Sequence, residues 1–206
     1  MCANEPVCWG SLSDVHHWFV LQDGVLVDFD AGVKNIFNGR SPEELNSGMM
    51  WAGISKADQF YAKLPWTSDG KSLWSKLKQL PKTPEILTGV PRSNKSRLEK
   101  VLWCKKELGM SCNHVDMAGK KSAHELVAGR RKNKPGVVNV ITCWSKNKHY
   151  ESKENRVLID DRLSLKEAWE AQGGIFIHHT NSERTLEILQ EKGMLDKTVT
   201  NHNQAD

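Results

Sequence analysis

Short apolar segments alternate regularly with helical segments over the C-terminal half of the chain, and few folds accommodate such a pattern. Between residues 84 and 193, most runs rich in Val, Ile and Leu are followed by a stretch with helical spacing. Strands are expected at 18–21, 84–89, 137–142, 156–161 and 175–178, and helices at 94–108, 165–172 and 182–192. Because this alternation builds βαβ units, it predicts an α/β three-layer sandwich with a parallel sheet and helices on both faces.

A helical block at about 34–80 interrupts the alternation just after the first expected strand. It contains a typical helix start, with Ser41 in the N-cap position, Pro42 in the first turn and Glu44 in the capping-box position. The main domain is expected to span 16–193, between an N-terminal lead-in and a polar tail. These flanking segments are residues 1–15 and 194–206.

A second interruption, at about 115–136, is polar and basic. Its cationic residues are Lys120, Lys121, Arg130, Arg131, Lys132 and Lys134. We interpret the segment as an insertion or mobile loop. It is either a solvated excursion or a docking surface at 120–134 for a nucleic acid or a protein assembly.

The composition favours a soluble, folded, intracellular protein. A chain of 206 residues suffices for one domain with a sizeable core. No apolar run reaches the roughly 18 residues that span a bilayer, so we expect no membrane association. The N-terminal residues lack the pattern of a secretory signal, and five cysteines without framework spacing fit a reducing compartment. We therefore expect the cytoplasm or an organelle, and not secretion.

Polar residues follow several expected strands at the edge of the sheet where ligands of open α/β proteins bind. Asp23 follows the first strand, Thr88 ends the second, and Asp160 and Asp161 end a later one. The strand at 137–142 leads toward Lys146 and Lys148. Carboxylates, a hydroxyl and an amine at one edge suit a divalent cation together with a phosphate group.

Three segments resemble motifs of the haloacid dehalogenase-like (HAD) phosphohydrolases, and most closely those of the 5'(3')-deoxyribonucleotidases and their bacterial relatives. The run Leu21-Gln22-Asp23-Gly24-Val25-Leu26-Val27-Asp28-Phe29-Asp30 resembles the first motif, Ile86-Leu87-Thr88-Gly89-Val90-Pro91 the second, and Leu158-Ile159-Asp160-Asp161-Arg162 the fourth. Asn147-Lys148-His149 stands where these relatives carry the lysine of the third motif. The resemblance covers about residues 16–193 and implies that the block at 34–80 is a small helical cap.

The resemblance also implies roles for individual residues. Thr88, Gly89 and Lys148 would bind phosphate. Asp160, Asp161 and the backbone carbonyl of Asp23 would hold Mg²⁺, and the Asp23 side chain would act as general acid or base. Other interpretations remain: the paired aspartates as a strand-end turn, Thr88 as a turn cap, and Lys148 as a solvated lysine.

One position departs from the family pattern in a way that bears on catalysis. In the family, the first aspartate of the first motif attacks phosphorus and ligates magnesium. Leu21 occupies this position and carries neither a nucleophilic atom nor a metal-ligand atom. An alternative register uses Asp28-Phe29-Asp30 as the motif, but it leaves Gly32 where Val or Thr is expected. Loss of such a nucleophile typically lowers kcat by about a million-fold.

Two functions follow from these motifs. The first is an inactive or impaired phosphatase homologue that serves as a binding or structural subunit, with magnesium binding weakened or lost. The second is a magnesium-dependent phosphohydrolase of the 5'-nucleotidase kind, acting on nucleoside monophosphates or other small phosphate esters. In both, a phosphorylated small molecule is the expected ligand. Phe60, Tyr61 and Trp66 are candidates for a nucleobase pocket or for packing of the cap, and His178 and His179 are expected to be structural.

Overall fold

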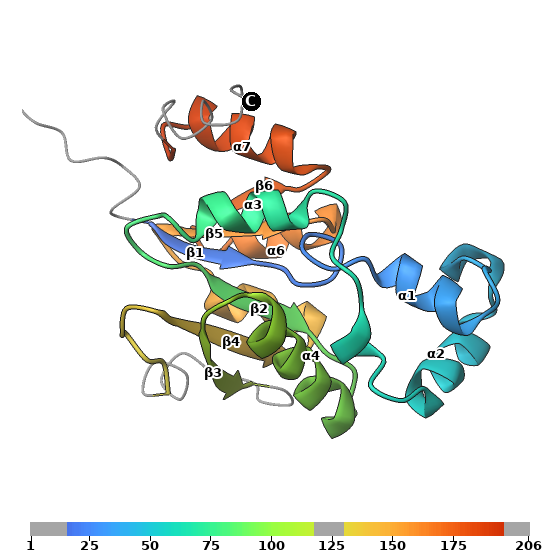
Figure 1. The fold of residues 1–206 in the computed structure, drawn as a ribbon. Helices are drawn as coiled ribbons and strands as arrows, with labels where there is room; N and C mark the ends of the chain where they lie inside the picture. Colours follow the sequence, from blue (N-terminus) through green and yellow to red (C-terminus); the bar gives the residue numbers. More distant parts are fainter. Residues whose placement is uncertain (1–15, 118–129, 196–206) are drawn as a thin grey trace, which may run out of the picture.

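The computed structural model describes residues 16–117 and 130–195, and in this part of the chain six strands form one sheet (Figure 1). The strands are β1 (His17–Val20), β2 (Glu85–Gly89), β3 (Ser111–Asp116), β4 (Val137–Cys143), β5 (Arg156–Asp160) and β6 (Ile175–His178). Their order across the sheet is β3-β4-β2-β1-β5-β6, and every neighbouring pair is parallel. The predicted α/β class with a parallel sheet is therefore confirmed.

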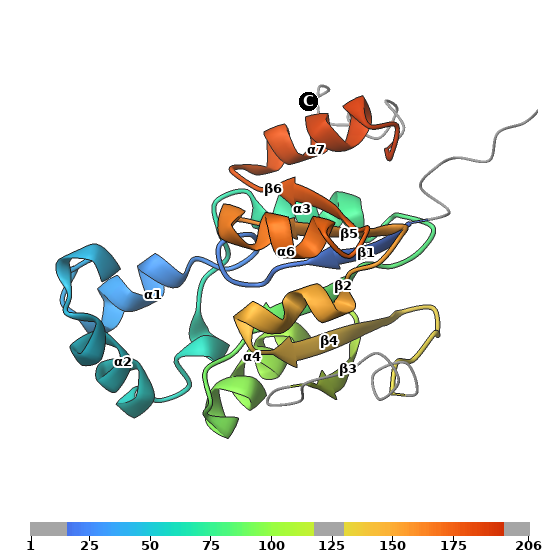
Figure 2. The same cartoon turned by 180° about the vertical axis from the view of Figure 1, so that it is seen from behind.

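Helices cover both faces of the sheet (Figures 1 and 2). One face carries α3 (Gly70–Leu77), α4 (Asn94–Glu107) and α7 (Ser182–Glu191), and the other carries α6 (Lys166–Glu170) and the 3-10 segment η4 (Ser145–Glu151). A second 3-10 turn, η5 (Leu163–Leu165), leads into α6.

Side chains of the central strand alternate between two separate cores, as the two-residue period of a strand requires. Trp18 and Val20 of β1 belong to the core under α3, α4 and α7. Phe19 points to the opposite face, where it contacts Trp169 of α6 edge to face. Since both faces are buried, the central strands have apolar residues at consecutive positions in their middle, and this pattern made them visible in the sequence.

A helical lobe projects beyond the carboxyl ends of the strands (Figure 1). It comprises α1 (Phe29–Ile36), η2 (Pro42–Glu44), α2 (Ser47–Lys56) and η3 (Tyr61–Lys63). The predicted capping box is present, with reciprocal hydrogen bonds between Ser41 and Glu44. The lobe is smaller than the cap expected at 34–80, because α3 packs on the sheet beside α7 with Leu73 and Leu77 in the core.

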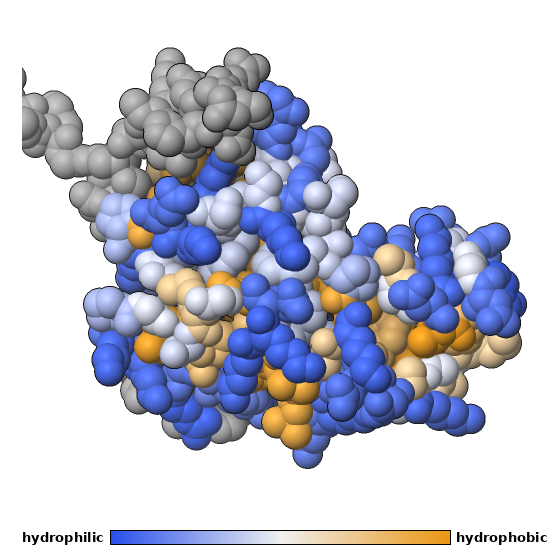
Figure 3. All heavy atoms as spheres, in the orientation of Figure 1, coloured by the Kyte–Doolittle hydropathy of each residue, from blue (hydrophilic) through white to orange (hydrophobic). Residues whose placement is uncertain are grey.

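Exposed hydrophobic residues belong in part to this lobe. Ile36 of α1 and Met49 and Trp51 of α2 are among the large apolar side chains that remain accessible. Figure 3 shows hydrophobic residues gathered on the lobe within a largely hydrophilic face of the molecule. None of the helices in the described residues combines the length and the apolar character needed to cross a membrane.

Strand β3 was missed by the sequence analysis, which placed the start of a basic insertion at 115. The strand lies at the edge of the sheet and pairs with β4 from Ser111 to Asp116. Its sequence is polar, and Asn113 and His114 reach the strand β4 through hydrogen bonds to Asn139 and Thr142. An edge strand of this kind lacks the apolar signal of a central strand.

The basic segment is described only from Arg130 onward, and Lys120 and Lys121 lie outside the described residues. Arg131 is not a solvated docking residue: its side chain is 7% exposed and forms ion pairs with Glu85 and Glu151. Arg130, Lys132 and Lys134 are exposed. The chain after 130 is therefore tied to the amino-terminal end of the sheet by a buried charge.

Candidate functional site

A cavity of about 850 Å³ opens at the carboxyl ends of the strands, between the sheet and the helical lobe. Its walls come from the loops that follow β1, β2, β4, β5 and β6 and, across from them, from α1, α2 and η3. Strand β1 lies between β2 on one side and β5 on the other, which is where the chain reverses its direction across the sheet. Ligands of open α/β sheets bind at such a switch point.

The turn after β1 presents Leu21 at the position where the strand ends. The Leu21 N–H donates to Ile159 O at 3.0 Å, so the backbone is still held against β5 there. The side chain lines the cavity but is only 3% exposed and joins the hydrophobic core. The other proposed register does not end a strand, because Asp28 caps α1 by accepting a hydrogen bond from Ala31 N at 2.8 Å.

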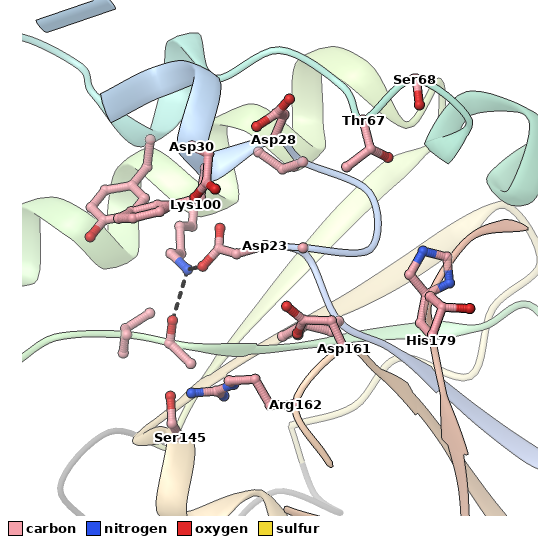
Figure 4. A pocket seen from close by; sticks show the side chains of 18 of the residues that line it. Asp23, Asp28, Asp30, Thr67, Ser68, Lys100, Ser145, Asp161, Arg162 and His179 are labelled. Carbon is pink, nitrogen blue, oxygen red and sulfur yellow. Dashed lines mark hydrogen bonds and ion pairs between the residues drawn. The ribbon is translucent and has the colours of Figure 1, made fainter. Parts of the chain in front are cut away.

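Gly24 allows the turn to approach the neighbouring β5 loop closely. Its φ of +81° lies in the left-handed region, and a Cβ on Gly24 would overlap the Asp161 carboxylate. Both Asp23 and Asp161 line the cavity, and Figure 4 shows them converging from the two loops. The motif glycine thus brings two carboxylates to one wall.

Lys100 of α4 is a site residue that the sequence analysis did not identify. Its ammonium donates to Thr88 Oγ1 at 3.1 Å and to Gly89 O at 2.8 Å, and it forms an ion pair with Asp23 (Figure 4). The side chain is 1% exposed and also lies over the ring of Tyr61, 5.0 Å from its centre. The ammonium is therefore held where β1, β2 and the lobe meet.

A signal for Lys100 exists in the sequence but is easy to overlook. Helix α4 buries Val101, Trp103 and Cys104. Lys100 shares their face, whereas Leu98 of the same helix is 64% exposed. A lysine among buried apolar positions, on the helix that follows the Thr88 strand, marks a cation directed at the strand end.

Lys148 and Asp160 form a buried pair behind the cavity wall. The Lys148 ammonium donates to Asp160 Oδ2 at 2.5 Å, and the second oxygen, Oδ1, accepts from Arg162 N at 3.0 Å. Burial lowers the pKa of Lys148, and the Asp160 carboxylate opposes that effect. Thr88 is likewise fully buried. Of the predicted residues, Asp23, Gly89 and Asp161 line the cavity, and Thr88, Lys148 and Asp160 form the layer beneath it.

Asp161 is the carboxylate with the most altered acidity. Burial, followed by repulsion from Asp160, raises its pKa to about 6. Its Oδ1 atom is buried and has no hydrogen-bond partner among the described residues, and the same holds for Oδ1 of Asp23. The cavity therefore contains two carboxylate oxygens that a proton, a water molecule or a bound ligand would have to satisfy.

The remaining walls are polar near the sheet and aromatic near the lobe. Arg162 and Ser145 line the cavity, and Figure 4 shows the Arg162 guanidinium directed toward Ser145. Trp51 and Tyr61 line it from the lobe. Phe60 and Trp66 instead pack against neighbouring rings, and they are not among the residues that line the cavity.

His179 also lines the cavity, from the loop after β6. Its Nδ1 atom lies 2.8 Å from Thr185 Oγ1, and burial lowers the pKa of the ring. His178 contacts the Asp161 carbonyl oxygen through Nε2 at 3.0 Å. These contacts fit the structural role expected for both residues.

The residues present do not fit the magnesium site that the family resemblance implies. Leu21 offers no oxygen, and both oxygens of Asp160 already accept hydrogen bonds. Asp23 is paired with Lys100. Of the ligands that the resemblance implies, this leaves the Asp161 carboxylate and the Asp23 backbone carbonyl, whereas Mg²⁺ requires near-octahedral coordination by oxygen. Within the described residues, no cluster of three or more His, Cys, Asp or Glu side chains is arranged as a metal site.

Comparisons with known proteins do not assign the chain to a family. No family model matches the sequence, and no curated protein is similar to it at a significant level. The site is therefore described by its geometry: a buried lysine paired with Asp23 at the cavity wall, two partly unsatisfied carboxylates, and an apolar side chain at the end of β1.

Proposed function

We propose that this chain is a HAD-like protein that binds a phosphorylated small molecule and does not hydrolyse it through an aspartyl-phosphate. The observation that carries the proposal is Leu21. It ends the extension of β1 at the cavity wall, where a nucleophile of this family would stand, and its side chain has no atom that attacks phosphorus.

Binding of phosphate is supported by the cationic groups at the sheet end of the cavity. Lys100 supplies a buried ammonium, and Arg162 and Ser145 supply further donors on the adjacent wall. In the proposed complex the phosphate replaces Asp23 as the charged partner of Lys100. Charge-assisted hydrogen bonds of this kind are about twice as strong as neutral ones.

The lobe provides a surface for the organic part of the ligand. Trp51 is 45% exposed, and Tyr61 lines the cavity with its ring 5.0 Å from the Lys100 ammonium. An aromatic wall opposite a phosphate site suits a nucleoside monophosphate or another phosphate ester with a flat apolar group. The proposed complex relies on Lys100 and Arg162, cationic side chains that line the cavity, and not on magnesium.

A phosphatase assay tests the proposal directly. The purified protein with magnesium should release no phosphate above background from nucleoside monophosphates or an aryl phosphate. Calorimetry should show that the same monophosphates bind and that EDTA changes their Kd by less than about twofold, because no divalent cation takes part.

Two variants at one position sharpen the assay. Leu21→Asp restores a carboxylate at the strand end and should create or raise turnover. Leu21→Asn introduces an amide of the same shape as the Asp side chain, but without a nucleophilic oxygen, and should leave turnover at background. Magnesium-dependent hydrolysis by the wild-type protein that disappears in Asp23→Asn would overturn the proposal. It would favour the second candidate function, a working 5'-nucleotidase-like phosphohydrolase.

A further inference from the structure

A pair of cationic side chains lies at the rim of the cavity, around the ring of Trp144. The Arg92 guanidinium is 6.0 Å from the centre of the ring and the Lys146 ammonium is 5.7 Å from it. Both distances are within the range in which a cation is attracted to an indole face. Arg92 and Lys146 are exposed and Trp144 is partly buried, so the ring serves as a fixed support for two accessible charges.

Neither of these two exposed charges has an acidic partner in the described residues, whereas several other cations of the molecule do. Arg97 is paired with Asp116, Arg184 with Glu187 and Glu191, and Lys63 with Asp58. No carboxylate in the described residues forms an ion pair with Arg92 or Lys146. Two like charges held near one ring repel each other, and an anion that bridges them relieves this repulsion.

Arg92 and Lys146 each stand next in the chain to residues that line the cavity. Arg92 directly follows Val90 and Pro91, which line the cavity after β2. Lys146 directly follows Ser145, which lines it after β4 and toward which Arg162 is directed (Figure 4). Arg92 and Lys146 do not line the cavity themselves, so a ligand with its first phosphate near Lys100 and Arg162 would reach them only with a group that extends past Pro91 and Ser145.

We propose that Arg92, Trp144 and Lys146 form a second anion subsite, and that the ligand of this protein is a small molecule with two phosphate groups on different atoms, such as a nucleoside bisphosphate. This inference rests on the proposed function, which supplies the first phosphate site. The subsite adds specificity, because a monophosphate leaves both rim cations without a partner.

The test compares ligands that differ by one phosphate. Calorimetry at fixed ionic strength measures binding of adenosine 5'-monophosphate and of adenosine 3',5'-bisphosphate to the wild-type protein, to Arg92→Ala/Lys146→Ala, and to Lys105→Ala/Lys106→Ala. The last variant removes two exposed charges from the far end of α4. In the wild-type protein the bisphosphate should bind about tenfold more tightly, which corresponds to two exposed ion pairs of ordinary strength.

The rim variant should lose this tenfold preference and keep its affinity for the monophosphate within about twofold, while the Lys105/Lys106 control should keep both affinities.

The subsite is refuted if the wild-type protein binds the monophosphate but shows no preference for the bisphosphate, or if the rim variant keeps the preference. An equal loss for both ligands would also refute it, since it indicates only general attraction. A 5'-phosphorylated oligonucleotide that binds more tightly than the bisphosphate would overturn the assignment to a small molecule. Failure of the wild-type protein to bind either nucleotide would contradict the proposed function itself.

Discussion

At the scale of single residues, the site is defined by which charges are paired with each other. Lys148 and Asp160 satisfy one another beneath the wall, and Lys100 takes Asp23 as its acidic partner. The family resemblance had assigned phosphate binding to Lys148, whereas the lysine that reaches the cavity lining is Lys100. The proposed function therefore depends on Lys100 more than on any residue of the third motif.

Replacement of Lys100 by Met should abolish or strongly weaken ligand binding. Removal of one partner of a buried, hydrogen-bonded charge pair costs about 2–5 kcal/mol, so the Kd for a nucleoside monophosphate should rise at least about thirtyfold. Calorimetry measures this change, and Lys105→Met on the outer part of the same helix serves as control. A Lys100→Met protein that folds and binds phosphate normally would show that the anion lies elsewhere.

The acidity of Asp161 gives the molecule a predicted pH dependence. Its pKa rises from 3.8 to about 6 because burial and Asp160 disfavour the charge. The folded state then binds more protons than the unfolded state between these values, so the group makes the free energy of unfolding fall as pH rises through that window. Asp161→Asn removes the cost of holding a charged carboxylate in this buried place. The free energy of unfolding of the variant, relative to wild type, should therefore rise from pH 4 to pH 7 and then stay constant. Denaturant unfolding at several pH values measures this difference, and an advantage independent of pH would contradict the assignment.

At the scale of elements, the loops after the strands determine the site more closely than the strands themselves. The loops after β1 and β5 meet because Gly24 has a left-handed backbone and no side chain. The apolar pattern predicted β1, β2, β4, β5 and β6, and the motif residues that follow them do gather at one edge. It did not predict β3, a mostly polar edge strand that pairs with β4 and adds contacts such as Asn113 to Asn139, nor the inward face of α4.

Gly24→Ala tests how much the close approach of these loops matters. The new Cβ adds backbone strain and a collision with the Asp161 carboxylate, so we expect a loss of about 2–4 kcal/mol of unfolding free energy together with weaker ligand binding. Gly39→Ala is a matched control, because φ is +87° there and a Cβ would meet no atom within 4 Å. Only the backbone strain, about 1 kcal/mol, should appear in that variant. Equal losses at the two positions would mean that the approach to Asp161 is unimportant.

At the scale of the whole molecule, the two ends of the sheet carry different kinds of charge cluster. The carboxyl end holds the cavity with its partly unsatisfied carboxylates. The amino-terminal end holds a buried network in which Glu85 accepts from Arg131 at 2.8 Å and from Asn139 at 2.7 Å. Arg156 donates to Glu151 at 2.9 Å, and both guanidinium groups lie over Phe19. The sequence indicated a basic segment at 115–136, but it could not indicate that the Arg131 side chain is buried, since only the fold places Glu85 and Glu151 opposite it.

Because the cavity and the buried ion-pair network lie at opposite ends of the sheet, mutations in the network should change stability without changing ligand binding. Arg131→Met leaves Glu85 and Glu151 with fewer cationic partners in a buried setting, and breaking a buried pair in this way typically costs about 3–5 kcal/mol. Thermal or denaturant unfolding should show that loss, whereas Lys134→Met, in the same basic segment but exposed, should change stability by less than about 0.5 kcal/mol. Under conditions where Arg131→Met remains folded, its Kd for a phosphorylated ligand should match wild type within about twofold, because the network lies at the opposite end of the strands. A folded Arg131→Met protein with normal stability but impaired binding would reverse the roles of the two clusters, and it would return the basic segment to the docking function that its sequence suggested.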